Sequence, residues 1–259
     1  MEQRLLSPGL AACHAFGSGP KLVIALHAFG RSGDAFARLD LSPRAAILAP
    51  DLPFHGQTRW AGQPLRPDTL AAWLRGIAAG ECFYLLGDSY GARLALAAVP
   101  HLHDVVRGLM LVAPDGLHTP GLRFVPAVSC KGLGRWLQPA KRRTRIAGLL
   151  QKTGVLGRVE QRFVRHFVLP QERWNKTTWP SWQAYSRFRF LPGQAAERLN
   201  EADLPVWIAL GDRDPVIQVD RIRQWAAKLE QAQIHTYCGG HRPPWTALSG
   251  AMQQWLASV

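Results

Sequence analysis

Residues 82–98 read CFYLLGDSYGARLALAA. The first five are apolar and typical of a buried strand, and the last seven have the composition of a helix. Between them stands Gly-Asp-Ser-Tyr-Gly, with Ser89 at its centre. A Gly-x-Ser-x-Gly sequence at a strand-to-helix junction forms a turn so tight that the flanking positions need almost no side chain. The pattern predicts a nucleophile elbow with the Ser89 hydroxyl held up at its tip. The alternative is a helix N-cap, in which that hydroxyl accepts a backbone N–H.

The rest of the chain predicts an α/β fold. Apolar runs typical of buried strands cover 21–27, 45–50, 82–86 and 205–210, and we predict further strands at 106–112 and 233–237. Helical patterns cover 67–79, 90–99, 220–230 and 246–257. Strands that alternate with helices predict a mostly parallel sheet with helices on both faces.

The alternation stops between about 115 and 200. Residues 116–199 hold 16 of the 31 lysines and arginines but only three acidic residues, so the whole net charge of +13 falls within this segment. We therefore predict an α/β core formed by 1–115 and 200–259, with a basic helical lid at 116–199 inserted between two core strands.

Composition narrows the class of protein. A chain of 259 residues fits one α/β domain with an insertion. No apolar stretch is long enough for a membrane span, and the N-terminus lacks the apolar region of a signal peptide. The four cysteines show no paired spacing, so we expect no disulfide, no metal site and a reducing, cytoplasmic environment.

A serine nucleophile needs a base and an acid that orients the base. Asp214 follows the predicted strand 205–210, and His241 follows the last one. Both then lie at the carboxyl ends of strands, the same edge of the sheet as Ser89, and in the order Ser, Asp, His. Asp115, after the strand 106–112, is the alternative acid.

Two backbone amides are candidates for an oxyanion hole. The small-residue turn His-Ala-Phe-Gly at 27–30 follows the first strand. It can direct the Phe29 N–H at the same point as the Tyr90 N–H, and such a pair would hold a developing oxyanion.

With these residues the chain resembles the serine hydrolases of the α/β-hydrolase fold, in the small, lid-bearing type. The matching motifs are HAFG at 27–30, DLPFHG at 51–56, GDSYG at 87–91, GDRD at 211–214 and GGH at 239–241. The resemblance implies Ser89 as nucleophile, His241 as base and Asp214 as its partner, with Phe29 and Tyr90 at the oxyanion hole. It implies no cofactor.

The chain departs from the family pattern at several places. Ala28, Phe54 and Ala92 stand where the family usually has glycine. The stretch before Lys21 is short, so we expect one or two outer strands of the usual sheet to be absent.

Candidates for substrate binding are His27, Arg93, Trp136, Phe163 and Trp182. For His27 the alternative is a structural role in a loop. Arg93 has two interpretations: a helix residue tied to a carboxylate, or an anion-binding group that resembles an arginine of the hydrolase-fold synthase of menaquinone biosynthesis.

The sequence thus favours hydrolysis of a small or medium acyl ester through an acyl-Ser89 intermediate. One alternative is C–C cleavage or elimination on an anionic substrate, as in that synthase, and another is a non-catalytic ligand-binding hydrolase fold. The basic segment suits a small acyl substrate with acidic groups or a weak contact with an anionic membrane surface. No motif indicates nucleic-acid binding, and the pattern does not indicate an oligomeric state.

Overall fold

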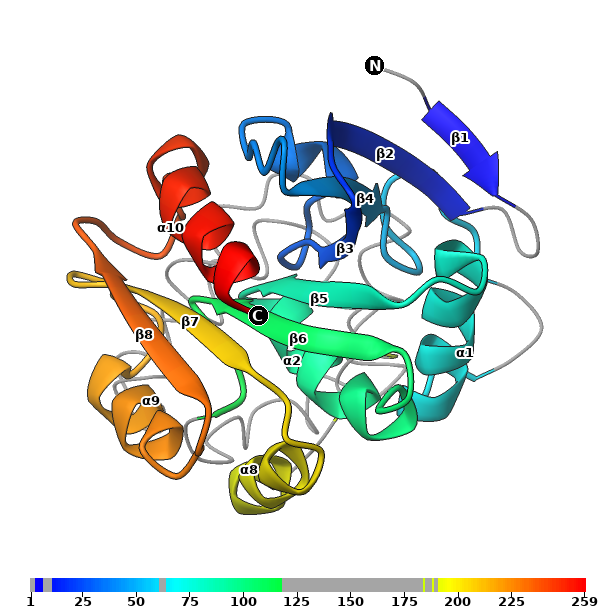
Figure 1. The fold of residues 1–259 in the computed structure, drawn as a ribbon. Helices are drawn as coiled ribbons and strands as arrows, with labels where there is room; N and C mark the ends of the chain where they lie inside the picture. Colours follow the sequence, from blue (N-terminus) through cyan, green and yellow to red (C-terminus); the bar gives the residue numbers. More distant parts are fainter. Residues whose placement is uncertain (1–2, 7–10, 61–63, 118–183, 185–187, 189–190) are drawn as a thin grey trace, which may run out of the picture.

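The computed structural model describes residues 3–6, 11–60, 64–117, 184, 188 and 191–259 (Figure 1). Its eight-stranded sheet has the order β1-β2-β4-β3-β5-β6-β7-β8. The strands are β1 (Gln3–Leu6), β2 (Ala11–Ser18), β3 (Lys21–Leu26), β4 (Ala45–Pro50), β5 (Phe83–Asp88), β6 (Val106–Val112), β7 (Val206–Gly211) and β8 (Ala232–Tyr237).

Strands β3 to β8 pair in parallel, which confirms the predicted α/β fold with a mostly parallel sheet. The outer strands β1 and β2 pair antiparallel to each other and to β4. The expectation that outer strands would be absent is therefore wrong. Residues 3–18 form both of them in a short stretch of chain, because antiparallel neighbours need only a tight connection and no crossover helix.

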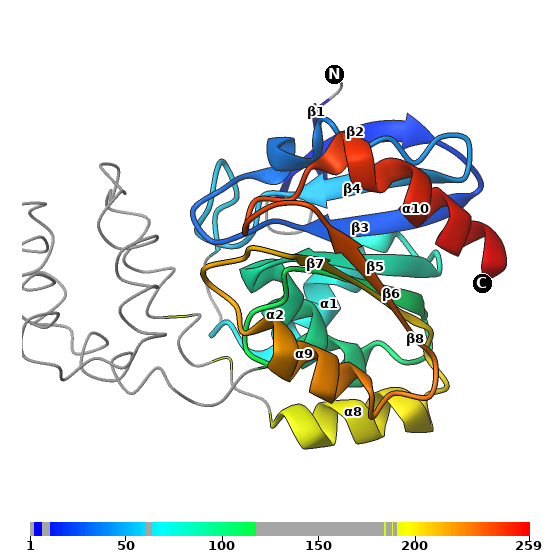
Figure 2. The ribbon, with the colours of Figure 1, turned by 90° about the vertical axis from the view of Figure 1, so that its left-hand side faces the viewer.

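Helices cover both faces of the sheet (Figure 2). On one face lie α1 (Pro67–Ala78), α2 (Tyr90–Ala98), α8 (Pro192–Glu201) and α9 (Val219–Ala226), and on the other lie the 3-10 turn η1 (Gly33–Phe36) and α10 (Trp245–Ser258). A further 3-10 turn, η2 (Val99–His101), follows α2. Alternate residues of each central strand face the two layers. In β3, for example, Ile24 and Leu26 join the core of α1 and α2, while Val23 and Ala25 join that of α10.

The predicted boundary between lid and core at residue 199 falls inside α8. Ala196 and Leu199 of this helix are buried in the same core as α1 and α2. Residues 118–183, which make up most of the predicted basic lid, lie outside the described part of the chain, so the inserted lid stays a prediction.

Lys21 connects the start of β3 to the end of α10. Its Nζ donates to the backbone oxygens of Leu256 and Val259, both at 2.5 Å. The same ammonium lies 5.1 Å from the centroid of the Tyr84 ring. A cation at the carboxyl end of a helix satisfies carbonyl groups that have no partner within the helix and complements the helix dipole.

We expect Lys21→Met to lower the free energy of unfolding by about 1–2 kcal/mol, because it removes charge-assisted hydrogen bonds but keeps an apolar stem. Urea denaturation measures this change, and hydrogen exchange should show faster opening at the end of α10. Lys228→Met makes the same change at an exposed site and is the control. Equal stability of the two variants would show that Lys21 does not secure α10.

Candidate active site

The nucleophile elbow lies between β5 and α2. Ser89 has φ 52° and ψ −106°, an uncommon backbone conformation for a residue with a side chain. A Cβ at Gly91 would sit 2.0 Å from the Leu26 carbonyl oxygen, and one at Gly87 would sit 2.4 Å from Ala92 Cα. The two glycines are therefore required because the start of α2 lies against β3 at Gly91 and against the end of β5 at Gly87.

Hydrogen bonds to the neighbouring strand hold the Ser89 backbone. The Ser89 N–H donates to the Val112 carbonyl (2.8 Å), and the Asp115 N–H donates to the Ser89 carbonyl (3.1 Å). The Ser89 side chain caps no helix N–H, so the N-cap alternative does not hold in this structure.

The hydroxyl of Ser89 instead faces His241. Ser89 Oγ lies 2.8 Å from His241 Nε2, and His241 Nδ1 lies 2.8 Å from Asp214 Oδ2. The three side chains come from the loops that follow β5, β7 and β8, at the carboxyl edge of the sheet. Since a carboxylate only accepts, His241 Nδ1 donates to Asp214 and Nε2 is left to accept the Ser89 proton.

Asp214 is fixed more firmly than a surface acid. Its side chain is fully buried, and Oδ1 accepts the N–H groups of Val216 (2.8 Å) and Ile217 (3.2 Å). One carboxylate oxygen is thus held by the loop, and the other is directed at His241.

The alternative acid, Asp115, pairs with a different residue. Its carboxylate lies 2.9 Å from Arg93 Nη2 in a mostly buried ion pair. The Arg93 guanidinium also lies 5.3 Å from the centroid of the Tyr90 ring. The geometry therefore favours Asp214 as the partner of His241, and it supports the interpretation of Arg93 as a helix residue tied to a carboxylate.

The two candidate oxyanion residues lie side by side. Strands β3 and β5 pair with Leu26 opposite Gly87, and Phe29 and Tyr90 each follow three residues later. Their rings meet edge to face, with centroids 5.8 Å apart. This register brings both loops to the tip of the elbow, and the role of the two amides stays a prediction.

His27 is held inside the protein. Its side chain is completely buried, Nδ1 donates to the Ala28 carbonyl (2.9 Å), and Nε2 accepts the Leu52 N–H (2.9 Å). Burial, reinforced by His55, holds the pKa of His27 well below its ordinary value, so the ring is neutral. Both nitrogens are engaged by backbone, which favours the structural role for His27, and substrate binding by this residue stays a prediction. Trp136, Phe163 and Trp182 lie outside the described residues.

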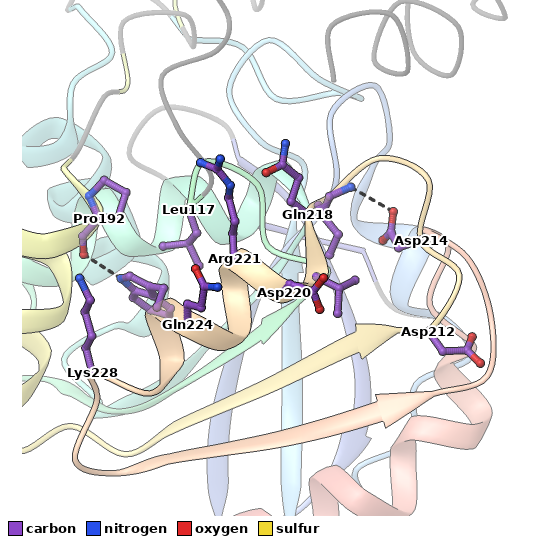
Figure 3. Close-up of a pocket in the computed structure, with 12 residues that line it drawn as sticks. Leu117, Pro192, Asp212, Asp214, Gln218, Asp220, Arg221, Gln224 and Lys228 are labelled. Atoms are coloured by element: carbon purple, nitrogen blue, oxygen red, sulfur yellow. Dashed lines mark hydrogen bonds between the residues drawn. The ribbon is translucent and has the colours of Figure 1, made fainter. Parts of the chain in front are cut away.

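A groove of about 920 Å³ adjoins Asp214 (Figure 3). It follows α9 and lies beside Leu117, the last described residue before 118–183, and Pro192, the first residue of α8, whose carbonyl accepts the Trp225 Nε1–H (2.7 Å). The lining residues are Leu117, Pro192, Asp212, Asp214, Ile217, Gln218, Val219, Asp220, Arg221, Gln224, Trp225 and Lys228. The groove carries both signs of charge and so does not by itself select an anionic ligand.

Within the described ranges, no group of three or more His, Cys, Asp or Glu side chains is placed to hold a metal ion. Across the same residues, no helix is long and apolar enough to cross a membrane.

Comparison with known proteins identifies the family of the chain. Residues 23–251 match the Alpha/beta hydrolase family. No curated protein matches the chain. Solved structures that are similar over the whole chain include a thermophilic esterase from Thermogutta terrifontis, with a TM-score of 0.70, 16% identity and coverage of 100% of this chain and 99% of the other.

Two further similar structures are described with other hydrolytic activities. The thioesterase domain from the curacin biosynthetic pathway has a TM-score of 0.65 and 20% identity, covering 99% of each chain. A meta-cleavage product hydrolase has a TM-score of 0.63 and 18% identity, covering 100% of this chain and 98% of the other. At such identities the likeness establishes the fold and not the substrate.

Asp88 is a buried acid at the site to which the sequence analysis gave no role. It ends β5, and its Oδ1 has no hydrogen-bond partner among the described residues. Burial raises the pKa of Asp88 to about 7, although the charges of His241 and Arg31 lower it, and Asp214 raises it further. A carboxylate at the end of an otherwise apolar strand is the sequence signal that could have revealed this group.

We expect Asp88→Asn to stabilise the protein above pH 7. The pKa of Asp88 is higher in the folded protein than its ordinary 3.8, so the folded state binds more protons than the unfolded state between these values. Stability therefore falls as pH rises through this interval, by at most about 4 kcal/mol. Asparagine cannot ionise and removes that loss.

Urea denaturation at pH 5 and pH 8.5 measures the difference. The advantage of Asp88→Asn over wild type should grow from the lower to the higher pH, whereas Asp220→Asn, on the exposed face of α9, should show no such growth. An advantage that is independent of pH would mean that Asp88 does not titrate in this range.

Proposed function

The chain belongs to the alpha/beta hydrolase family, and on that premise we propose that it hydrolyses carboxylic esters of small or medium acyl chain length through an acyl-Ser89 intermediate. The observation that carries the proposal is the continuous series of hydrogen bonds from Ser89 Oγ through His241 to the buried Asp214. The esterase activity in the description of one similar structure agrees with it.

In the proposed reaction, His241 Nε2 takes the Ser89 proton as Oγ attacks the carbonyl carbon of the ester. Asp214 holds the imidazole and stabilises the imidazolium that forms. The Phe29 and Tyr90 amides donate to the oxyanion, each contributing about 3 kcal/mol of transition-state stabilisation. The imidazolium then returns its proton to the departing alkoxide oxygen. Water activated by His241 releases the acid from the acyl-serine.

Two alternatives remain testable beside this proposal. The case for elimination on an anionic substrate rested on Arg93 and on the basic segment at 116–199, and in this structure Arg93 pairs with Asp115. C–C hydrolysis would use the same three residues, and a meta-cleavage product hydrolase shares the fold. A non-catalytic binding role is less consistent with an intact hydrogen-bonded series, since binding requires none of it.

We also propose that the basic segment at 116–199 attracts an anionic part of the substrate or an anionic lipid surface. Its charge supports this proposal, because it carries the entire net charge of +13. Hydrolysis or vesicle binding should then weaken as salt rises, since added ions screen exposed charges.

We expect a fluorophosphonate to label the wild-type protein at Ser89 and to leave Ser89→Ala unlabelled. A series of p-nitrophenyl esters of increasing chain length, with turnover as the readout, then distinguishes the reactions. A maximum at one chain length supports ester hydrolysis. Labelling without turnover of any ester supports C–C cleavage or elimination, and absence of labelling contradicts the nucleophile assignment.

The acid of the triad is tested by a matched pair of variants. Asp214→Asn should lower kcat by about 10³–10⁴-fold, because the amide no longer selects the productive imidazole tautomer. Asp115→Asn should keep kcat within about tenfold but lower the free energy of unfolding by about 1–3 kcal/mol, because Arg93 loses its partner. The reverse pattern of activity loss would assign the acid to Asp115.

A further inference from the structure

Two buried histidines hold the loop that carries Phe29, one on each side of that residue. His27 precedes it in the chain, and His55 comes from the loop after β4. The centroids of the two imidazole rings lie 5.2 Å apart, and the His55 ring meets the Phe29 ring at 5.4 Å. The loop is thus enclosed by aromatic rings as well as joined to them by hydrogen bonds.

On the first side, the Ala28 carbonyl accepts hydrogen bonds from His27 Nδ1 (2.9 Å) and from the Arg31 N–H (3.1 Å). This carbonyl and the Phe29 N–H belong to one peptide group, and in a trans peptide the two point in opposite directions. Fixing the Ala28 carbonyl toward His27 therefore turns the Phe29 N–H away from it. A hydrogen-bonded carbonyl also makes its own amide a stronger donor.

On the second side, the Gly30 N–H donates to His55 Nε2 (3.1 Å). That N–H belongs to the peptide group that follows Phe29. Gly30 has φ 76°, the left-handed region in which the chain reverses. Because the peptide groups before and after Phe29 are both held, the backbone dihedral angles of Phe29 are fixed.

His55 can do this because it is rigid and neutral. Its Nδ1 donates to the Pro53 carbonyl (3.1 Å), which leaves Nε2 as an acceptor. Burial lowers the pKa of His55, although the Pro53 carbonyl and the Asp51 carboxylate raise it, so the ring has no second proton at neutral pH.

Asp51 fixes the loop that carries His55. Its carboxylate accepts the N–H groups of Gly33 and Gln57, each at 2.8 Å. A Cβ at Gly56, where φ is 51°, would lie only 1.9 Å from Asp51 Oδ2, so this loop closes tightly around the acid. These contacts fix the backbone of the loop that carries His55.

We propose that His55 is a positioning residue of the oxyanion hole: by accepting the Gly30 N–H it holds the Phe29 peptide with its N–H directed to the elbow. This inference rests on the proposed function, because it assigns Phe29 as an oxyanion donor. His27 acts from the other side through the Ala28 carbonyl. His55 touches no reacting atom and acts only through the loop.

Two substitutions separate the parts of the His55 side chain. His55→Phe keeps a ring beside Phe29 and His27 but has no acceptor for the Gly30 N–H. His55→Gln loses the ring but places an amide oxygen close to the position of Nε2. His103→Phe makes the same change at an exposed histidine and is the control.

We expect His55→Phe to lower kcat for p-nitrophenyl butyrate about 30-fold, less than the complete loss of an oxyanion donor, with KM within about twofold of wild type. His55→Gln should recover kcat to within about fivefold. The rate of fluorophosphonate labelling should follow kcat, and thermal melting should show that each variant is folded.

The outcomes distinguish this inference from the proposed function. If wild type labels and His55→Phe keeps wild-type kcat, His55 does not position the loop while the nucleophile assignment stands. If both His55 variants lose activity together with melting temperature, the role is structural stability and the inference is overturned. If wild type neither labels nor turns over the ester, the proposed function fails first.

Discussion

The strained backbone of Ser89 is the constraint on which the rest of the site depends. Its conformation is uncommon for a residue with a side chain, and it persists because the Val112 carbonyl and the Asp115 N–H hold the two polar groups of its backbone. Gly91 permits the close approach of α2 to β3, and Gly87 permits that of α2 to the end of β5, as this turn requires. If strand β6 shifted, the elbow would relax and Ser89 Oγ would move away from His241. The chemistry is thus tied to the packing of the central sheet.

Three acidic residues lie near the elbow, and each has a different environment. Asp214 is held by two amides and directed at His241. Asp115 is neutralised by Arg93. Asp88, with one oxygen that no described residue satisfies, has a pKa raised to about 7. Near His241, one carboxylate is thus oriented toward the imidazole, a second is paired with a guanidinium, and a third has a raised pKa.

The sequence was sufficient to predict the central strands, the elbow and the order of Ser89, Asp214 and His241, because each follows a predicted strand, and the strands before Ser89 and Asp214 are strongly apolar runs. It failed for β1 and β2, whose short segments mix polar and apolar residues, and β2 joins the sheet through β4, which is distant in the chain. The pairing of Arg93 with Asp115 and the enclosure of His27 depend on three-dimensional contacts that no local pattern records. For the same reason the sequence favours Asp214 over Asp115 by its position but does not exclude Asp115.

Leu117 is the last described residue before 118–183 and Pro192 is the first residue of α8, and both are held by the core: Leu117 is buried, and the Pro192 carbonyl accepts the Trp225 Nε1–H. Neither anchor takes part in the hydrogen bonds among Ser89, His241 and Asp214. Insertions and deletions in the sequence between Leu117 and Pro192 can therefore accumulate in evolution without removing any of the side chains that form these hydrogen bonds.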